Sequence, residues 1–399
     1  MSYFLLPSVP YNNKLMNSIH GRHIVDETDE VSINKTLCRY LNNIKAEIDS
    51  RQAEWDKYKK YTNPYEFIHS TVPSSKQAVC RLKPLSRSFY KMVELCNSLL
   101  LLDDLPDRCR TFHLAEGPGG FMEAMTHMRA NKDDSYYGMT LIDDTDQSVP
   151  GWKKSKTFLA KNPNVIIENG QDGTGDLMNA ENLKDCFTRY HGSIDLITAD
   201  GGFDFSVDFN HQEEVSGKLV FCQIAFAIAM QKKKGNLVIK FFDTFTQMSL
   251  DLLFLLSNVY EQVYFVKPNT SRYANSEKYV VCKGFRLGNS EGLVKQMYSV
   301  FKAFPEEGNM RRVFTMDIPY IFTSRVEEYN AIFGQQQIES ITSTLNLIDN
   351  NKHDRLESMK KNNIQKCISW CQKYKLPYNK VIATSNIFLA GRAQSLESS

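Results

Sequence analysis

The sequence lacks several features that would assign it to a familiar class of protein. It has no apolar run of about 18 residues, so we expect no transmembrane helix and no membrane partner. The opening MSYFLLPSVPYNNK has neither the basic stretch nor the small-residue cleavage site of a secretory signal peptide. The nine cysteines are odd in number and form no CxxC pair, which argues against a disulfide or zinc scaffold. We therefore expect a reducing, intracellular location, in the cytoplasm or alternatively the nucleus, and no metal site.

The chain also lacks an excess of charge of either sign. Its 48 Lys and Arg residues nearly balance its 46 Asp and Glu residues, for a net charge of +2. Any contact with a nucleic acid must therefore come from a local basic groove. The composition is otherwise ordinary for a globular protein, with 42% hydrophobic and 24% charged residues over 399 positions. This length predicts one large domain with extensions, or two to three smaller domains.

Short apolar runs alternate with helical patterns through the middle of the chain. This alternation predicts an α/β fold, with a doubly wound, Rossmann-like sheet of seven mainly parallel strands. The link before the last strand is too short for a parallel crossover, so that strand should be antiparallel. The expected strands cover residues 111–115, 136–141, 164–168, 194–199, 236–241, 263–266 and 278–283, and the expected helices 32–62, 86–102, 120–128, 213–232, 247–259, 325–345 and 352–373.

These elements predict three parts. Residues 1–75 form an N-terminal helical extension, residues 76–290 form the α/β domain, and residues 291–399 form a C-terminal helical extension.

The stretch FHLAEGPGGFMEAM, residues 112–125, predicts a strand, a tight turn and a helix. Gly117, Gly119 and Gly120 would let the backbone approach a ligand, and the helix start offers free N–H groups. The turn has neither the GxGxxG spacing of a dinucleotide site nor the GK[ST] of a P-loop. Glu116 beside the glycines would repel a pyrophosphate and would suit a positive group, such as the ammonium or sulfonium of S-adenosylmethionine. A plain strand-to-helix turn remains the alternative.

A second acidic turn, NGQDGTGDL, follows the expected strand 164–168. Its Asp172 would reach the same edge of the sheet, where ligands of doubly wound folds bind. A carboxylate there can accept a hydrogen bond from the exocyclic amine of adenine. An ordinary Asp-Gly turn explains the pattern equally well.

Charged residues also stand at the ends of other apolar strands. Asp200 ends ITAD, Lys240 ends NLVIK, and Glu277 stands at the edge of the last strand. Lys91 lies in the helix just before the first strand. A lysine between apolar residues is costly to bury without partners, so these four are expected to surround one crevice. Ordinary surface charge explains any one of them, but explains all four together poorly.

The motifs PGGF, ADGGF, IKFFDTFT and KPNTSRYANSEKYVVCKGF follow one another between about Ser86 and Phe285. In this order they resemble the FtsJ/RrmJ-like ribose 2′-O-methyltransferases, above all the messenger-RNA cap methyltransferases of eukaryotes and large DNA viruses. The resemblance implies S-adenosylmethionine as cofactor and a catalytic tetrad of Lys91, Asp200, Lys240 and Glu277. It implies these cofactor-binding residues: Ser86, Glu116, Gly117, Pro118, Gly119, Gly120, Phe121, Asp172 and Asp200. The chain departs from the common pattern with His113 for an Asp and Glu116 for an Ala.

The chemistry gives each of these residues a role. The ribose hydroxyl is a weak nucleophile that must be oriented and lose its proton. Lys240 is expected to accept that proton, kept neutral by burial and by the facing cation Lys91, while Asp200 orients Lys240. Glu277 would hold Lys91 and steer the ribose.

The partner implied is RNA, with the capped 5′ end of a messenger RNA the expected substrate. Ser271, Arg272 and Asn275 are expected to hold its backbone and ribose. Aromatic residues before the domain are candidates to stack on a cap guanine, although most such residues belong to cores: Trp55, Tyr58, Tyr61, Tyr65 and Phe67.

Two other functions stay open at this point. A catalytically silent RNA-binding subunit could retain the fold, and the unusual Glu116 favours it, while the intact set of four charged residues argues against it. A nucleotide-dependent oxidoreductase would need the glycine spacing that the turn lacks.

Overall fold

The computed structural model describes the chain except for residues 13–14, 16, 23–30, 74, 144, 147–148, 203–211, 305–309, 351, 381 and 383–399. Its centre is an eight-stranded sheet of order β1-β8-β9-β7-β6-β3-β4-β5. The strands are β1 (Ser2–Leu5), β3 (Arg110–Leu114), β4 (Ser135–Met139), β5 (Val165–Glu168), β6 (Ile194–Ala199), β7 (Gln231–Phe241), β8 (Tyr260–Lys267) and β9 (Lys278–Phe285). A separate two-stranded ribbon joins β2 (Ile19–Arg22) to β10 (Arg312–Phe314).

The predicted fold class is confirmed. Strands β5, β4, β3, β6 and β7 pair in parallel, and β9 pairs antiparallel with both β7 and β8. The prediction of seven strands was one short, because β1 adds to the outer edge of β8 in antiparallel register, with Ser2 opposite Lys267. The N-terminal residues therefore belong to the central sheet. The three-part division of the chain stays a prediction.

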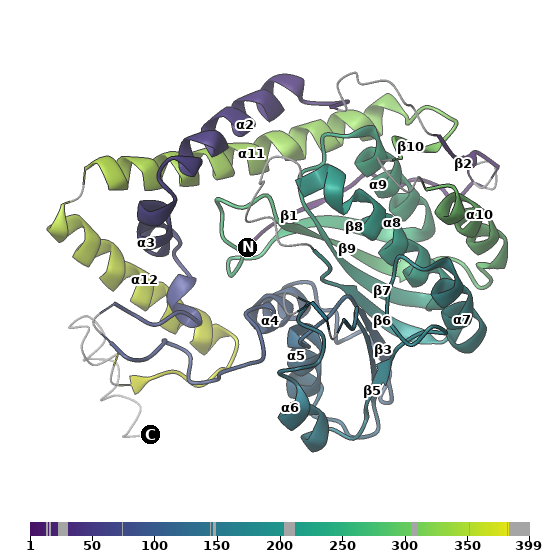
Figure 1. Cartoon of the computed structure of the whole chain (residues 1–399), viewed down its shortest axis with the longest axis horizontal. Coiled ribbons are helices and arrows are strands. Elements are labelled where there is room, and N and C mark those ends of the chain that lie inside the picture. The colour runs from purple at the N-terminus through teal and green to yellow at the C-terminus, as the bar shows by residue number, and fades with distance from the viewer. Residues whose placement is uncertain are drawn as a thin grey trace.

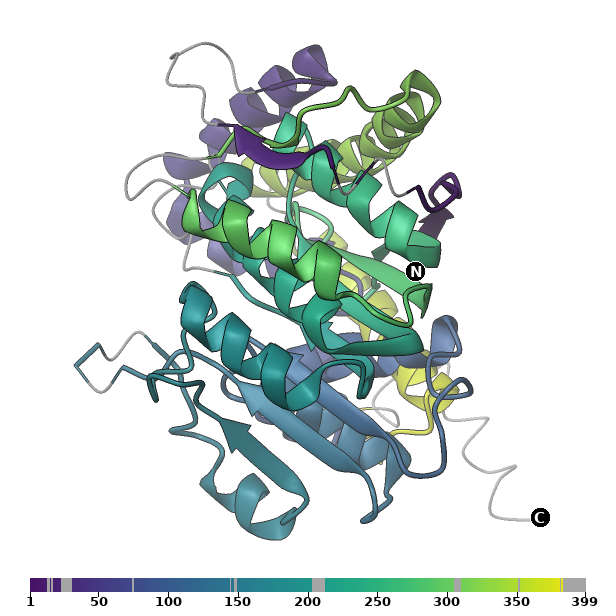
Figure 2. The ribbon, with the colours of Figure 1, turned by 90° about the vertical axis from the view of Figure 1, so that its right-hand side faces the viewer.

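Helices cover both faces of the sheet (Figures 1 and 2). Along β7, Leu237 and Ile239 join one apolar cluster, while Val238 between them joins the other, as the period of a strand requires. The first cluster includes side chains of α7 (Ala180–Tyr190), α8 (Gln212–Met230), α9 (Gln247–Val259) and α10 (Glu291–Lys302). The second includes α4 (Ser88–Ser98), α5 (Gly120–Arg129), α6 (Lys156–Lys161) and α12 (His353–Lys373).

The remaining helices form an arm along one side of the sheet (Figure 1). Helices α2 (Lys35–Asp49) and α3 (Gln52–Thr62) pack on the long α11 (Tyr320–Asp349), and the 3₁₀ turn η1 (Glu66–Ile68) packs on α12. The expected single helix 32–62 is interrupted, because Arg51 leaves helical geometry with φ −130° and ψ 24°. Gly334 of α11 allows the close approach of α2, since a Cβ there would lie 3.0 Å from the Leu37 side chain.

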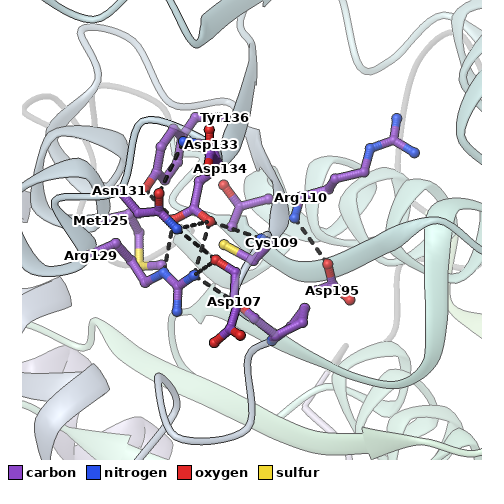
Figure 3. A network of polar contacts seen from close by, with 12 residues as sticks. Asp107, Cys109, Arg110, Met125, Arg129, Asn131, Asp133, Asp134, Tyr136 and Asp195 are labelled. Carbon is purple, nitrogen blue, oxygen red and sulfur yellow. Dashed lines mark hydrogen bonds and ion pairs between the residues drawn. The ribbon is translucent and has the colours of Figure 1, made fainter.

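A buried polar network lies at the amino edge of the sheet, where the parallel strands β3 and β4 begin (Figure 3). The carboxylate of Asp134 accepts hydrogen bonds from the Cys109 backbone at 2.8 Å, from Tyr136 Oη at 2.9 Å and from Arg129 Nε at 2.8 Å. Arg129 also donates to the carbonyl of Asp107. The Asp134 carboxylate and the Arg129 guanidinium pair with each other and with groups of the fold itself, so we read the network as a structural tie between α5 and the starts of β3 and β4.

One buried ion pair connects η1 to the loop between β8 and β9. Glu66 of η1 accepts two hydrogen bonds from Arg272, from Nε at 3.0 Å and from Nη2 at 2.6 Å. Asn63 and Ser70 donate to the same carboxylate at 2.7 and 2.8 Å. Burial alone would raise the pKa of Glu66, but the hydrogen bonds and charge of Arg272 hold it well below its ordinary range.

Replacing Glu66 with Gln should lower the free energy of unfolding at pH 7 by about 3 kcal/mol, because Arg272 is left without its counter-charge. The unfolded carboxyl takes up a proton near its ordinary pKa of 4.5, whereas the folded one takes it up only at lower pH. The stabilisation is therefore complete above about pH 5 and is lost as the pH falls further. Urea denaturation of both proteins from pH 7 to pH 3.5 measures the difference between their free energies of unfolding. If that difference does not become smaller as the pH falls, the assignment is contradicted.

Candidate active site

The four charged residues predicted to share a crevice lie together at the carboxyl edge of the sheet. Asp200 follows β6, Lys240 lies near the end of β7, and Glu277 precedes β9. Parallel strands end at one edge, and an antiparallel neighbour begins there, so the topology alone brings these three together. Lys91, on α4, completes the group from one face of the sheet.

A continuous chain of contacts connects the four side chains. Lys91 Nζ donates to Glu277 Oε2 at 2.7 Å and to Tyr279 Oη at 3.3 Å. Tyr279 Oη donates to Asp200 Oδ1 at 2.7 Å. Lys240 Nζ lies 3.5 Å from the same Oδ1 and donates to the Asp200 carbonyl at 2.7 Å. The two ion pairs are thus joined through one phenol.

Sequence reasoning missed Tyr279 and Ser88. Tyr279 lies within the expected strand 278–283, whose apolar pattern gives it no separate role, yet its hydroxyl bridges the two ion pairs. Ser88 Oγ donates to Asp200 Oδ2 at 2.6 Å. A tyrosine among Val and Cys residues, two positions from an edge carboxylate, was the available signal for the first. For the serine the sequence offers no signal, because nothing local indicates which side chain of α4 faces Asp200.

The burial of this group sets its electrostatics. Burial alone would raise the pKa of Glu277, but the charge of Lys91, followed by those of Lys240 and Lys267, holds it far below its ordinary range. Burial lowers the pKa of Lys91 and lowers that of Lys267 to about 7. Burial, aided by the neighbouring charge of Asp200, raises the pKa of Tyr279, which therefore keeps its proton as a donor.

The glycine turn lies beside this network. Gly119 adopts φ +108°, a conformation that side chains disfavour, and a Cβ on Gly117 would lie 2.7 Å from the Gly151 carbonyl oxygen. A Cβ on Gly120 would collide with the hydroxyl of Ser86. Ser155 Oγ donates to the carbonyl of Pro118. The glycines are therefore required by the turn itself and by its close packing, in addition to any ligand.

Glu116 is almost fully buried, with 4% of its surface exposed. Its Oε1 accepts hydrogen bonds from the backbone N–H groups of Phe121 and Met122 at the start of α5. Its Oε2 is buried and has no hydrogen-bond partner among the described residues. Burial, followed by the charge of Asp200, raises the pKa of Glu116 well above its ordinary value. The free oxygen fits a ligand group that brings a donor or a positive charge.

Two further residues named in the sequence analysis, Asp172 and His113, form hydrogen bonds with side chains near them. Asp172 Oδ1 accepts from Thr174 and Asn182, and its Oδ2 accepts from Asn179 at 2.7 Å. Burial would raise the pKa of Asp172, but these hydrogen bonds hold it at about 2. His113 is buried in β3 between Thr111 and Thr198, with 2.8 Å to each hydroxyl. Burial lowers the pKa of His113 to about 3, so its ring is neutral. The role of Asp172 toward adenine stays a prediction.

The three residues predicted to hold RNA occupy the loop between β8 and β9. Ser271 Oγ donates to Glu277 Oε1 at 2.7 Å, and the fork of Arg272 is engaged by Glu66. Asn275 is exposed, and its carbonyl accepts from Lys267 Nζ at 2.6 Å. In this structure Ser271 and Arg272 thus hold the wall of the crevice, while Asn275 is turned to solvent. Their contacts with RNA stay a prediction.

A cavity of about 160 Å³ adjoins that loop, lined among others by Trp55, Lys45, Lys59 and Tyr273. Of the five aromatic residues proposed to stack on a cap, Trp55 alone is among the residues that line it. Phe67 is fully buried in an apolar cluster, and Tyr61 packs against it edge to face.

The chain is similar to known methyltransferases. The model of the FtsJ-like methyltransferase family matches residues 84–285. The chain is 29% identical over 277 residues to "Cap-specific mRNA (nucleoside-2'-O-)-methyltransferase 1" of Mus musculus, covering 67% of this chain and 32% of that protein. It is 27% identical over 356 residues to "Cap-specific mRNA (nucleoside-2'-O-)-methyltransferase 2" of Danio rerio, covering 82% and 45%. The chain thus spans less than half the length of these relatives.

Among solved structures, a putative ribosomal RNA methyltransferase from Plasmodium falciparum overlaps 50% of this chain and 98% of its own, with 20% identity and a TM-score of 0.36. That overlap is too loose to add to the assignment. The family match is different, because it takes in half of the chain, including the glycine turn and all four charged residues of the crevice. The chain belongs to the FtsJ-like methyltransferase family.

Proposed function

We propose that the chain transfers a methyl group from S-adenosylmethionine to a ribose 2′-hydroxyl of RNA, at the nucleotide next to the cap of a messenger RNA. The observation that supports this best is the contact chain from Glu277 through Lys91, Tyr279 and Asp200 to Lys240. It collects two amines and two carboxylates in a largely buried crevice, as proton removal from a weak hydroxyl nucleophile requires.

The residues at the glycine turn fit the cofactor. The free Oε2 of Glu116 is suited to the ammonium of the methionine part, and the turn offers backbone at the mouth of α5. When bound, S-adenosylmethionine supplies a methyl group made electrophilic by a sulfonium. Glu116 and the backbone of residues 117–120 would hold the cofactor, with Ser86, Pro118 and Phe121 shaping the turn and Asp172 directed at the adenine.

The side chains of the crevice divide the remaining work. In its neutral form, Lys240 Nζ accepts the proton of the ribose hydroxyl with its lone pair, and Asp200 fixes the position of that amine through its carbonyl and carboxylate. Gly202 leaves room for it, since a Cβ there would lie 2.9 Å from Nζ. Lys91 and Glu277, each held by the other, orient the ribose and keep the crevice electrostatically balanced.

The cavity beside the loop is our candidate for the capped end. The rings of Trp55 and Tyr273 offer a stacking surface of the kind that holds unpaired bases. Lys45 and Lys59, which pair with Asp243 and Asp56, add positive charge to the lining. The two relatives are named as cap-specific mRNA methyltransferases, which supports the same substrate.

Replacing Lys240 with Met should lower the single-turnover methylation rate of capped RNA by about 100-fold or more, because the proton acceptor is lost while the side-chain volume is kept. Binding of S-adenosylhomocysteine, measured by calorimetry, should stay within about twofold of the unchanged protein. Transfer of a tritiated methyl group to capped, uncapped and internally paired RNAs gives the rates.

The same assay decides the broader proposal. Uncapped RNA should be methylated much more slowly than capped RNA. Equal rates on both RNAs would refute the proposed preference for capped RNA. No transfer by the unchanged protein would instead support an RNA-binding subunit without activity. Rapid turnover by the Lys240→Met protein would show that Lys240 is not the proton acceptor.

Glu116→Gln should weaken S-adenosylhomocysteine binding by about tenfold, since the amide can keep the two N–H contacts at α5 but cannot ionise to pair with the ligand ammonium. Its melting temperature should stay close to that of the unchanged protein. Glu116→Ala is the matched control that also removes the helix contacts, so it should lose stability as well. Unaltered affinity in the Gln variant would mean that Oε2 does not face the cofactor.

A further inference from the structure

A second cavity, of about 490 Å³, lies at the start of α4 and is lined by His69 among others. The cavity beside Trp55 is lined by Arg272, and the two cavities share no lining residue. Arg87, which lines the second cavity, stands one helical turn before Lys91. The adjacent Ser88 contacts Asp200. The cavity therefore adjoins the catalytic crevice.

The lining of this cavity is strongly basic. Lys76, Arg81 and Lys83 are exposed at its rim, and Arg87 and His69 lie deeper. Among the described residues that line it, none is acidic. Because the chain as a whole carries a net charge of only +2, such a one-signed pocket is not a consequence of composition. It is suited to an anionic ligand.

Arg87 has a buried donor to offer. Its Nη2 donates to the Thr270 carbonyl at 3.4 Å, but its Nε is buried without a hydrogen-bond partner among the described residues. A buried guanidinium nitrogen without an acceptor is costly, so the site is better satisfied by a ligand oxygen. A phosphate oxygen is the acceptor that a guanidinium binds best.

His69 offers the opposite kind of group. Ser70 Oγ donates its one hydrogen to Glu66 Oε1 at 2.8 Å, so the 3.1 Å contact with His69 must run from the ring Nδ1–H to that hydroxyl oxygen. Burial, followed by the charge of Arg87, lowers the pKa of His69 to about 4, so the ring is neutral. Its buried Nε2, which has no partner in the described part of the chain, is therefore an acceptor.

We infer that this cavity binds a nucleotide of the substrate RNA downstream of the methylated one, with its phosphate on Arg87 and the rim cations and its ribose 2′-hydroxyl on His69. A ribonucleotide carries both groups on one unit, a phosphate for the cation and a hydroxyl for the acceptor nitrogen, so it matches this pair of side chains. The downstream direction rests on the proposed function, which seats the capped end in the other cavity.

Fluorescence anisotropy with labelled capped RNAs of one and eight nucleotides tests the phosphate part, because the shorter one has no nucleotide downstream of the methylated position. The triple variant Lys76→Ala, Arg81→Ala, Lys83→Ala should bind the longer RNA about tenfold more weakly, with a shallower salt dependence, and the capped single nucleotide unchanged. The matched control, with the exposed Lys132, Lys184 and Lys233 changed to Ala, removes the same charge elsewhere and should bind both normally. Equal losses in the two triple variants would overturn the inference.

The ribose part has its own test. The unchanged protein should bind the longer RNA about fivefold more tightly than the same strand with 2′-deoxyriboses downstream of the first nucleotide. His69→Phe should bind both strands equally while keeping a normal melting temperature, and His69→Asn, which retains an acceptor oxygen, should recover part of the preference. No preference in the unchanged protein, or one that survives in His69→Phe, would contradict the inference.

Inorganic phosphate is the probe for the alternative ligand. Phosphate that binds the unchanged protein but not the rim variant, while both bind long RNA equally, would assign the cavity to a free anion and overturn the inference. All these measurements report binding without turnover. RNA binding that meets these expectations in a protein without methyl transfer would therefore reject the proposed function and retain the cavity assignment.

Discussion

The buried ion pair between Lys91 and Glu277 is the constraint on which the rest of the site depends. Its 2.7 Å contact joins α4 to the loop before β9, two segments that are far apart in the chain. Two buried charges cost much solvation, and the pair is tolerable only because Ser271 and Tyr279 supply further hydrogen bonds. The pair, and with it the arrangement of the crevice, therefore depends on the conformation of that loop.

Residues from distant parts of the chain hold the loop in place. Glu94 of α4 accepts from the backbone N–H groups of residues 269 and 270, Glu66 holds Arg272, and Lys267 donates to two loop carbonyls. From the C-terminal arm, Gln337 of α11 donates to the carbonyl of residue 274 at 3.0 Å. Helices α2, α3 and α11 thus support the wall of the crevice, and the cavity beside Trp55 lies where they meet it.

The sequence carried enough information for the fold class and for the grouping of four charged residues. Strand patterns located the carboxyl edge, and an acid or amine at each strand end had few explanations other than a shared crevice. Local patterns did not reveal β1, a four-residue strand whose partner is more than 250 residues away, or the break at Arg51. They also did not reveal that Arg272 pairs with Glu66, because that pairing is a tertiary contact over 206 positions. Pairing between polar side chains that are far apart in the sequence produces no periodic pattern from which it could be predicted.

A double-mutant cycle on the single-turnover methylation rate, at saturating RNA and S-adenosylmethionine, tests the central claim most directly. Lys91→Met and Glu277→Gln each remove one half of the pair. If the pair acts as a unit, the double variant should be no slower than the slower single variant, because either change already breaks the constraint. Rate losses that simply multiply would show two residues acting independently, and would contradict the account of a crevice built around one buried ion pair.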